Sequence, residues 1–395
     1  MARRESEDRS LVSSELADAM LQWRRHLHQN PEFGFEEEAT ARFVVEKLRE
    51  FGIEDIETGI GGTGVIATLQ CGNGDRIIAL RADMDCLQIH ETTNLPYSSN
   101  TPGLMHACGH DGHTTILLGA AAVLANDGGF DGKVRFVSQP AEEWGQGMKA
   151  MIQDGLGSRL GFDEIYGLHN KPGLPVGSFE TTPGPFMGAE DGFRITVRGS
   201  GGHASRPHDC NDAILCACSI VSELQMIVSR TIDPAELAVV SVTSIEGDNI
   251  KNAISSEACI EGDCRHFNDT VSHTIEDAMR RIVKGLADGH GCTAEIAYDR
   301  VFVPLVNNPE ATAHGLKAAM TVFGEKSTNP KAPRMGASED FAQALKVSPG
   351  AFFNFGNGDS APLHSPKYDF DDAALVPSVK WFVELVRNRL PISGQ

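Results

Sequence analysis

Residues 133–140, KVRFVSQP, form a short apolar stretch between two segments of helical character. The small-residue segment TTILLGAAAVLAND (114–127) precedes this stretch, and KAMIQDGL (149–156) follows it. A second strand candidate, EIYGLHN (164–170), comes next along the chain. Helices that alternate with continuous apolar strands are typical of parallel sheets that are covered on both faces. The sequence therefore predicts an α/β fold with a mostly parallel sheet and helices on both faces.

A different pattern occupies the middle of the chain. GFRITVRG (192–199) alternates apolar and polar residues as a half-buried strand does, and DAILCACSIVSELQMIVSR (212–230) has the pattern of an amphipathic helix. We therefore expect a discontinuous catalytic domain at 13–185 and 303–392. A smaller α+β domain of four strands and two helices is expected to interrupt it at 186–302.

Composition limits the partners that this protein can have. The chain has 395 residues and a formal net charge of −20 at pH 7, and because nucleic acids are bound by basic surfaces we expect no nucleic-acid partner. The charged start MARRESEDRS lacks the apolar core of a secretory signal, and no apolar stretch long enough to span a membrane is expected. Nine cysteines without a C-x-x-C pair predict reduced thiols in a cytoplasmic protein.

Side chains that bind metals stand where the predicted strands end. Cys108 and His110 precede a helix, Glu142 and Glu143 follow the strand 133–140, His169 ends the strand 164–170, and His364 lies in the loop after GAFFNFGNG (350–358). Because the carboxyl ends of strands in an open α/β sheet border one crevice, we expect these side chains to converge. Cys108 and His110 are expected to point to the same side of a locally extended segment, since alternate residues do so.

The types of these side chains favour a pair of metal ions. Thiolate, imidazole and carboxylate donors together suit zinc or a similar first-row ion. Five donors exceed one tetrahedral site, but they suit two ions about 3.5–4 Å apart if a thiolate bridges them. The adjacent Glu142 and Glu143 can then divide the work: one binds metal, and the other takes a proton from water that the ions have made more acidic.

Other interpretations remain open from the residues alone. A single buried cysteine is more often a small apolar residue than a ligand, and a pair of glutamates in a turn is more often solvated. A hydrolase with Cys108 as nucleophile and a histidine as base is one alternative, and a non-catalytic metal-binding protein is another. His106 and His113 are expected to lie behind the site or to begin a helix rather than to bind metal.

Eight motifs stand in the order and spacing of a known group of enzymes, from about residue 15 to residue 390. They are RRHLHQNPEFGFEEEAT (24–40), LRADMDCLQIHE (80–91), MHACGHDGHT (105–114), QPAEE (139–143), GLHN (167–170), GSGGHASRPH (199–208), MGASEDFA (335–342) and LHSPKYDFDD (363–372). Together they resemble the aminoacylase/carboxypeptidase superfamily of co-catalytic metallohydrolases. The branch of most similar character contains amidohydrolases such as hippurate hydrolases, N-acyl-amino-acid deacylases and auxin-conjugate hydrolases.

The resemblance implies a site for two divalent metal ions in which Cys108 is the bridging ligand. The other implied ligands are His110, Glu143, His169 and His364. Zn²⁺ or Mn²⁺ are the expected ions, with Co²⁺ and Ni²⁺ as alternatives. Glu142 is implied as the general base and later as the proton donor.

Three further residues take roles that the resemblance implies. His203 and Asn252, in the inserted domain, match residues that in the family reach the active site of a partner subunit and bind the scissile carbonyl or the substrate carboxylate. Asp83 would orient the ligands from behind. The resemblance therefore implies that the inserted domain at 186–302 acts as a lid and as the surface through which a homodimer, or a tetramer, forms.

The implied reaction is metal-dependent hydrolysis of the amide bond of N-acyl amino acids, which releases a carboxylate and a free amino acid. The acyl group would be of the acetyl, benzoyl or arylacetyl type. Dipeptides and N-carbamoyl amino acids are alternative substrates for the same metal site. The sequence leaves the acyl group and the amino acid open.

Overall fold

The computed structural model describes residues 11–248 and 250–392, and contacts divide the chain into two units. The first unit consists of the residues up to Gly184, of Val306–Pro333 and of the chain from Asp340 onward. The second unit consists of Pro185–Leu305 and Arg334–Glu339. Two short strands, β7 (Gly184–Met187) and β14 (Leu305–Asn307), pair where the chain passes from one unit to the other.

The segment Arg334–Glu339 lies outside the range 186–302 that the sequence indicated for the insertion. It clusters with the second unit because the backbone N–H of Gly188 donates to the carbonyls of Met335 and Ala337, at 2.9 Å in each case. Its polar sequence carries no strand or helix pattern, so only the tertiary contacts assign it.

The first unit is built on an eight-stranded sheet with the strand order β1-β2-β4-β3-β5-β16-β6-β15. The bounds are β1 (Asp55–Ile60), β2 (Gly64–Cys71), β3 (Ile77–Asp83), β4 (Gly132–Gln139), β5 (Glu164–Lys171), β6 (Phe179–Glu180), β15 (Thr328–Asn329) and β16 (Gly350–Gly356). The neighbours β4, β3, β5 and β16 are parallel, so their carboxyl ends meet at one edge of the sheet. The predicted α/β fold is confirmed.

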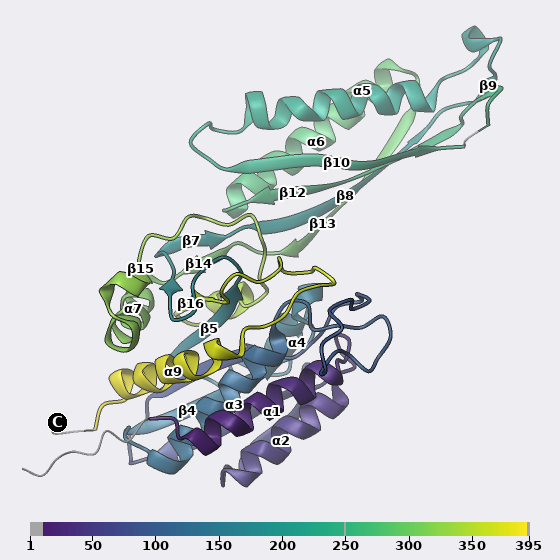
Figure 1. The fold of residues 1–395 in the computed structure, drawn as a ribbon. Helices are drawn as coiled ribbons and strands as arrows, with labels where there is room; N and C mark the ends of the chain where they lie inside the picture. The colour runs from purple at the N-terminus through teal and green to yellow at the C-terminus, as the bar shows by residue number, and fades with distance from the viewer. Residues whose placement is uncertain (1–10, 249, 393–395) are drawn as a thin grey trace, which may run out of the picture. The chain divides into compact units, whose positions relative to one another are not determined.

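Helices cover both faces of this sheet, because successive strand residues point to opposite sides. In β16, Phe353 packs on Trp381 (ring centroids 4.8 Å apart), whereas the preceding Phe352 packs on Phe341 (5.2 Å), next to α8. Figure 1 shows α1, α3 and α9 side by side in one layer. The helices are α1 (Ser14–Gln29), α2 (Glu38–Glu50), α3 (His110–Asp127), α4 (Gly147–Gln153), α7 (Pro309–Phe323), α8 (Ala342–Leu345) and α9 (Leu375–Arg389), with the 3-10 turns η1 (Glu142–Trp144), η4 (Glu325–Ser327) and η5 (Asp372–Ala374).

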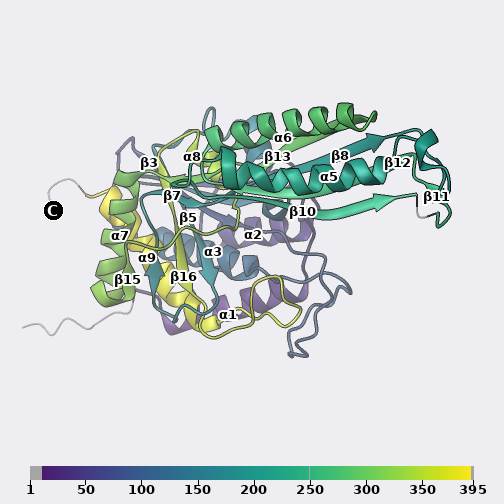
Figure 2. The ribbon, with the colours of Figure 1, turned by 90° about the horizontal axis from the view of Figure 1, so that it is seen from above.

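The second unit is an antiparallel sheet with two helices on one face, which lie side by side along the strands (Figure 2). The sheet has the order β10-β12-β8-β13, with β8 (Ala189–Arg198), β10 (Ala238–Gly247), β12 (Glu257–His266) and β13 (Thr293–Phe302). The helices are α5 (Ala213–Met226) and α6 (Asp269–Gly289), and the smaller elements are β9 (Gly202–His203), β11 (Ala253–Ile254), η2 (Pro207–Asp209) and the π turn η3 (Ile227–Thr231). The four strands and two helices match the expected α+β composition.

Helix α5 and the turn η3 are more apolar than the sequence analysis recognised. Ala213–Thr231 has a mean hydropathy of 1.5, and by length and composition it is the one helical segment among the described residues that is apolar enough to cross a membrane. Glu223 and Arg230 interrupt the segment without lowering its mean hydropathy below that range. Ile220 and Leu224 pack into the core of the second unit, and core helices of soluble proteins have the same composition.

We expect Trp381→Ala to lower the free energy of unfolding of the metal-free protein by about 3–5 kcal/mol. Trp381 is fully buried, and its indole N–H donates to the carbonyl of Gly315 (3.0 Å), so its removal leaves a cavity and an unpaired acceptor. Trp144→Ala, at a residue that is 44% exposed, is the control and should change the free energy by less than about 1 kcal/mol. Urea unfolding measures both variants, and equal losses would contradict this prediction.

Candidate metal centre

Donor atoms from four separate parts of the first unit gather in overlapping groups, within each of which all atoms lie within 4.8 Å of one another. One group consists of Cys108, His110 and His169. A second group consists of Cys108, Glu143 and His364, and a third brings Glu142 to His110 and Glu143. The structure therefore places the five expected ligands together, with the expected base beside them, and the thiol is common to two of the groups.

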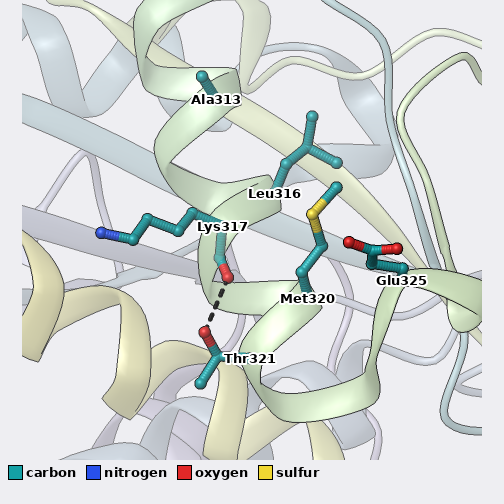
Figure 3. A pocket seen from close by; sticks show the side chains of 6 residues that line it. All are labelled: Ala313, Leu316, Lys317, Met320, Thr321 and Glu325. Atoms are coloured by element: carbon teal, nitrogen blue, oxygen red, sulfur yellow. Dashed lines mark hydrogen bonds between the residues drawn. The ribbon is translucent and has the colours of Figure 1, made fainter.

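The donors are not part of the surface groove that runs along α7. That groove has a volume of about 490 Å³. The residues that line it are Ala313, Leu316, Lys317, Met320, Thr321 and Glu325 (Figure 3). The hydroxyl of Thr321 donates to the carbonyl of Lys317 (3.1 Å). None of the residues that line the groove is a donor of the metal groups, so we assign the groove no part in the site.

Cys108 and His110 reach the same centre through a turn and not through an extended segment. Gly109 has φ +92°, and His110 is the first residue of α3. The expectation of a locally extended segment was therefore wrong, because a positive φ turns the chain into the helix. A Cβ atom at position 109 would lie 2.3 Å from Oδ1 of Asn170, so both the conformation and the available space require glycine.

The two glutamates lie in a tight turn directly after β4. Glu142 and Glu143 begin η1, and Ala141 before them has φ +47°. The backbone N–H of Glu143 donates to Oδ2 of Asp85 (3.0 Å). The backbone N–H of Asp340 donates to Oε1 of Glu142 (3.4 Å), whose side chain is buried. The conformation of this turn therefore determines where both carboxylates lie.

The remaining two histidines come from β5 and from the loop after β16. Nδ1 of His169 contacts the carbonyl of Asn170 (2.7 Å), which leaves Nε2, 3.3 Å from Sγ of Cys108, to face the centre. His364 has φ +63°, and its Nε2 lies 3.4 Å from Oε2 of Glu143. A non-glycine residue in this backbone conformation is uncommon, and such residues concentrate at functional sites.

Asp83 lies behind the ligands and is fully buried. Its Oδ1 is 2.7 Å from Nδ1 of His113, and its Oδ2 accepts an N–H from Arg81 (2.8 Å) and lies 3.7 Å from Nε2 of His110. His113 also contacts Oδ1 of Asn170 (2.8 Å), which places it behind the site as expected. These contacts support an orienting role for Asp83.

Sequence reasoning missed Asp85, which contacts two of the expected ligands. Its carbonyl and its Oδ1 lie 3.0 and 3.2 Å from Nδ1 of His110, and its Oδ2 accepts the backbone N–H of Glu143. The motif RADMD contained the signal, because Asp83 and Asp85 are two residues apart and point to the same side wherever the chain is extended.

The local charges shift the pKa values of two of the histidines in opposite directions. Burial lowers the pKa of His110, but the carboxylates of Asp83 and Asp85 outweigh burial and raise this pKa to about 10. Burial and the like charge of His113 hold the pKa of His169 well below its ordinary value. His169 therefore stays neutral at physiological pH, which is the form of imidazole that binds metals.

The surroundings of Cys108 disfavour it as a nucleophile. Burial, with the carboxylates of Glu143 and Glu142 nearby, raises the pKa of the Cys108 thiol well above its ordinary value. A catalytic cysteine needs the opposite shift. A divalent cation, in contrast, deprotonates a thiol that coordinates it, so this thiol suits a ligand.

The residues of the centre fit a pair of divalent ions. Nε2 of His110 and Oε1 of Glu143 are buried, and neither makes a hydrogen bond with any described residue. These two atoms lie 3.9 Å apart. Buried polar atoms are normally paired, so donors left in this state are suited to a cation that would satisfy them. The thiol, imidazole and carboxylate set is also the one that zinc and similar ions bind.

His203 and Asn252 lie together, but in the second unit. His203 of β9 is paired with Ala253 of β11, and the backbone N–H of Ala204 donates to the carbonyl of Asn252 (3.1 Å). Both residues are exposed, and Nδ1 of His203 accepts from the backbone N–H of Ser205 (3.1 Å). The donors of the metal centre all belong to the first unit.

Comparison with known proteins supports the same type of centre. Residues 79–388 match the family Peptidase family M20/M25/M40. The chain is 39% identical to a hippurate hydrolase of Campylobacter jejuni (93% of this chain, 95% of the relative) and 36% identical to an N-acetylcysteine deacetylase of Bacillus subtilis (93% and 95%).

A solved structure extends the comparison to the fold. The Bacillus subtilis YXEP protein, described as a dinuclear metal binding peptidase from the M20 family, has a TM-score of 0.84 and 32% identity. The match covers 96% of this chain and 99% of that protein. The resemblance that the motifs indicated is thereby confirmed. This chain belongs to peptidase family M20/M25/M40 and is a metal-dependent hydrolase of amide bonds.

Proposed function

We propose that this protein hydrolyses the amide bond of N-acyl amino acids and releases a carboxylate and a free amino acid. The observation that carries the proposal is the pair of donor groups that share Cys108, with Glu142 beside them. The names of two relatives, hippurate hydrolase and N-acetylcysteine deacetylase, support this class of substrate, because both substrates are N-acyl amino acids.

In this proposal five residues would hold two divalent ions, and one of them, Cys108, is common to two of the donor groups. The other four are His110, Glu143, His169 and His364. When bound, the two ions would polarise the amide carbonyl and make water more acidic. The thiolate and imidazole donors favour Zn²⁺, and Mn²⁺, Co²⁺ and Ni²⁺ are the alternatives to be compared by reconstitution.

Glu142 is the proposed general base. It takes a proton from the attacking water and later delivers it to the nitrogen of the leaving amine. The backbone N–H of Asp340, 3.4 Å from Oε1 of Glu142, orients the carboxylate, and burial of the side chain keeps bulk water from competing for the proton. Glu142 is therefore proposed to act as the base, whereas the adjacent Glu143 in the same turn is proposed to bind metal.

We further propose that the second unit is a lid that also joins two chains in a homodimer. Its surface exposes apolar side chains on α5 and β10, among them Ile214 (42%), Leu215 (57%) and Val239 (48%). In addition, β10 is an edge strand, and an edge strand can pair with another chain. His203 and Asn252 would then bind substrate in the active site of the partner chain.

The cysteines support a cytoplasmic location for the enzyme. All nine are free thiols, and disulfides are rare in reducing compartments. We propose on this ground that the enzyme works in the cytoplasm.

We expect the metal-reconstituted enzyme to release free amino acids from N-acetyl, N-benzoyl or arylacetyl amino acids. Removal of metal with a chelator should abolish the activity, and Zn²⁺ or Mn²⁺ should restore it, since the donors alone supply no Lewis acid. Amino-acid release from a panel that also contains dipeptides and N-carbamoyl amino acids measures the preference. Activity that survives the chelator but is lost on thiol alkylation would contradict the proposal and favour a cysteine nucleophile.

Glu142→Gln is expected to lower kcat by about 10²- to 10⁴-fold, because the amide cannot take the proton. The variant should keep its bound metal, since the proposed ligands are intact. Glu143→Gln, one residue away in the same turn, is the matched variant and should lose metal on dialysis. Metal content and kcat are measured for both, and a Glu142→Gln enzyme of normal kcat would refute the assignment of the base.

If His203 serves the active site of the other chain, two inactive variants should complement each other. Equal amounts of His203→Ala and Glu142→Gln, mixed under conditions that exchange subunits, should recover about a quarter of the wild-type activity, because half of the dimers are mixed and each carries one intact site. Each variant alone is the control. A mixture no more active than its components, with mixed dimers demonstrated by mass, would contradict the shared site.

A further inference from the structure

The turn that carries Glu142 and Glu143, with the start of the helix that follows it, is held by carboxylates from three distant parts of the first unit. Glu37 accepts the backbone N–H of Ala141 (2.8 Å), and Asp85 accepts that of Glu143 (3.0 Å). Asp340 accepts the backbone N–H of Met148 (2.9 Å), which lies in α4 just after the turn. Asp85 also contacts His110, and Asp340 contacts Glu142. Glu37 contacts the turn through a backbone N–H, as Asp85 does, but among the described residues its carboxylate forms hydrogen bonds only with Ala141 and Thr63, whereas Asp85 also contacts the proposed ligand His110.

Glu37 is placed at the start of a helix but does not serve the helix. It is the residue before α2, and its side chain makes no capping hydrogen bond there. Glu32 accepts the backbone N–H groups of Ala39 (3.0 Å) and Thr40 (2.7 Å) instead. The Glu37 carboxylate is therefore available to Ala141 and to the hydroxyl of Thr63, which donates to Oε2 at 2.5 Å.

Burial of the Glu37 carboxylate is energetically unfavourable. Glu37 is 0% exposed, and burial is the main reason that its pKa is raised to about 7, against the opposing effect of the hydrogen bonds from Thr63 and Ala141. A buried ionisable group costs free energy even when it is hydrogen-bonded. Of the two hydrogen bonds that this buried carboxylate accepts, one comes from Thr63 and the other from the turn.

The residue that Glu37 holds has an unusual backbone conformation. Ala141 has φ +47°, a left-handed value that non-glycine residues rarely adopt. A Cβ atom built on Gly34 would lie 3.1 Å from both Cα and Cβ of Ala141, so the space on that side is also tight. Such conformations persist only where the surroundings hold them in place. The next two residues are the proposed base and a proposed metal ligand.

We propose that Glu37 is a positioning residue of the metal centre, which fixes Glu142 and Glu143 by accepting the backbone N–H of Ala141. The role of Glu142 in this inference rests on the function proposed above, whereas the role of Glu143 is tested by metal binding alone. This role requires a hydrogen-bond acceptor at the position of Oε1 of Glu37, and a side chain as long as that of glutamate. It does not require a negative charge.

Two variants of Glu37 distinguish the effect of side-chain length from the effect of side-chain charge. Glu37→Gln keeps the length, so that its amide oxygen accepts from Ala141 and its amide nitrogen donates to the hydroxyl of Thr63. Glu37→Asp keeps the charge but is one methylene shorter, so it fails to reach the N–H of Ala141. Both variants keep a polar side chain at a buried position.

The primary measurement is the affinity for Zn²⁺, obtained by competition with a chromophoric chelator, and it needs no substrate. Glu37→Asp is expected to lose about 10- to 100-fold in Zn²⁺ affinity, the range found when groups that orient ligands are removed. Glu37→Gln should stay near the wild-type affinity. With metal at saturation, Glu37→Asp should lower kcat and leave KM near the wild-type value, because Glu37 does not touch substrate.

The melting temperature of the metal-free variants shows whether a loss is merely structural. If Glu37→Asp does not fold, Thr63→Val takes its place, since it removes the hydroxyl that holds the Glu37 carboxylate; a loss of Zn²⁺ affinity in the same direction is then expected. Wild-type Zn²⁺ affinity in the shortened variant, or a loss in Glu37→Gln as large as that in Glu37→Asp, would overturn the inference. If no N-acyl amino acid is hydrolysed, the proposed function fails while the comparison of Zn²⁺ affinities still decides the role of Glu37.

Discussion

The metal centre depends on four parallel strands that end at one edge of a sheet. Because β4, β3, β5 and β16 are neighbours and run in one direction, the chain that follows each strand emerges at the same edge. Glu142 and Glu143 follow β4, His169 lies in β5, and His364 lies in the loop after β16. Helix α3 begins at that edge as well, with His110 as its first residue. Donors that are remote along the chain therefore meet at this edge of the sheet.

The same arrangement concentrates charge where burial makes it costly. Asp83 is fully buried, and His110, His113 and Arg81 hold its pKa well below the ordinary value against the effect of burial. Removal of one partner from a buried ion pair costs roughly 3–5 kcal/mol, because the remaining charge is left uncompensated. The charged groups of the centre thus stabilise one another. Cations that bind the unpaired Nε2 of His110 and Oε1 of Glu143 would complete the balance of charge.

Carboxylates that hold the ligands in place are the part of the site that is hardest to predict from sequence motifs. Asp85 and Glu37 act on the turn of Glu142 and Glu143 through backbone N–H groups. A backbone donor has no signature in the sequence, since every residue except proline carries one. The hydrogen-bond donor to a glutamate such as Glu37 can therefore be identified only from the tertiary structure, in which Ala141 lies beside it.

The sequence by itself determined the alternation of strands and helices, the insertion and the types of the metal donors. Local patterns are sufficient for these features, because hydrophobic period and residue chemistry are read without knowledge of neighbours in space. It also placed the donors at strand ends, from which their convergence followed. It did not reveal that the chain turns at Gly109, between Cys108 and His110. The positive φ of Gly109 and the closeness of Asn170 require glycine at this position.

Only the tertiary structure decided which groups orient the donors and which unit each segment joins. Arg334–Glu339 clusters with the second unit through backbone hydrogen bonds to Gly188, and Asp85 faces both His110 and Glu143. The physical reason is that such contacts are hydrogen bonds between groups distant in sequence, and their geometry exists only once the sheet and its helices have packed.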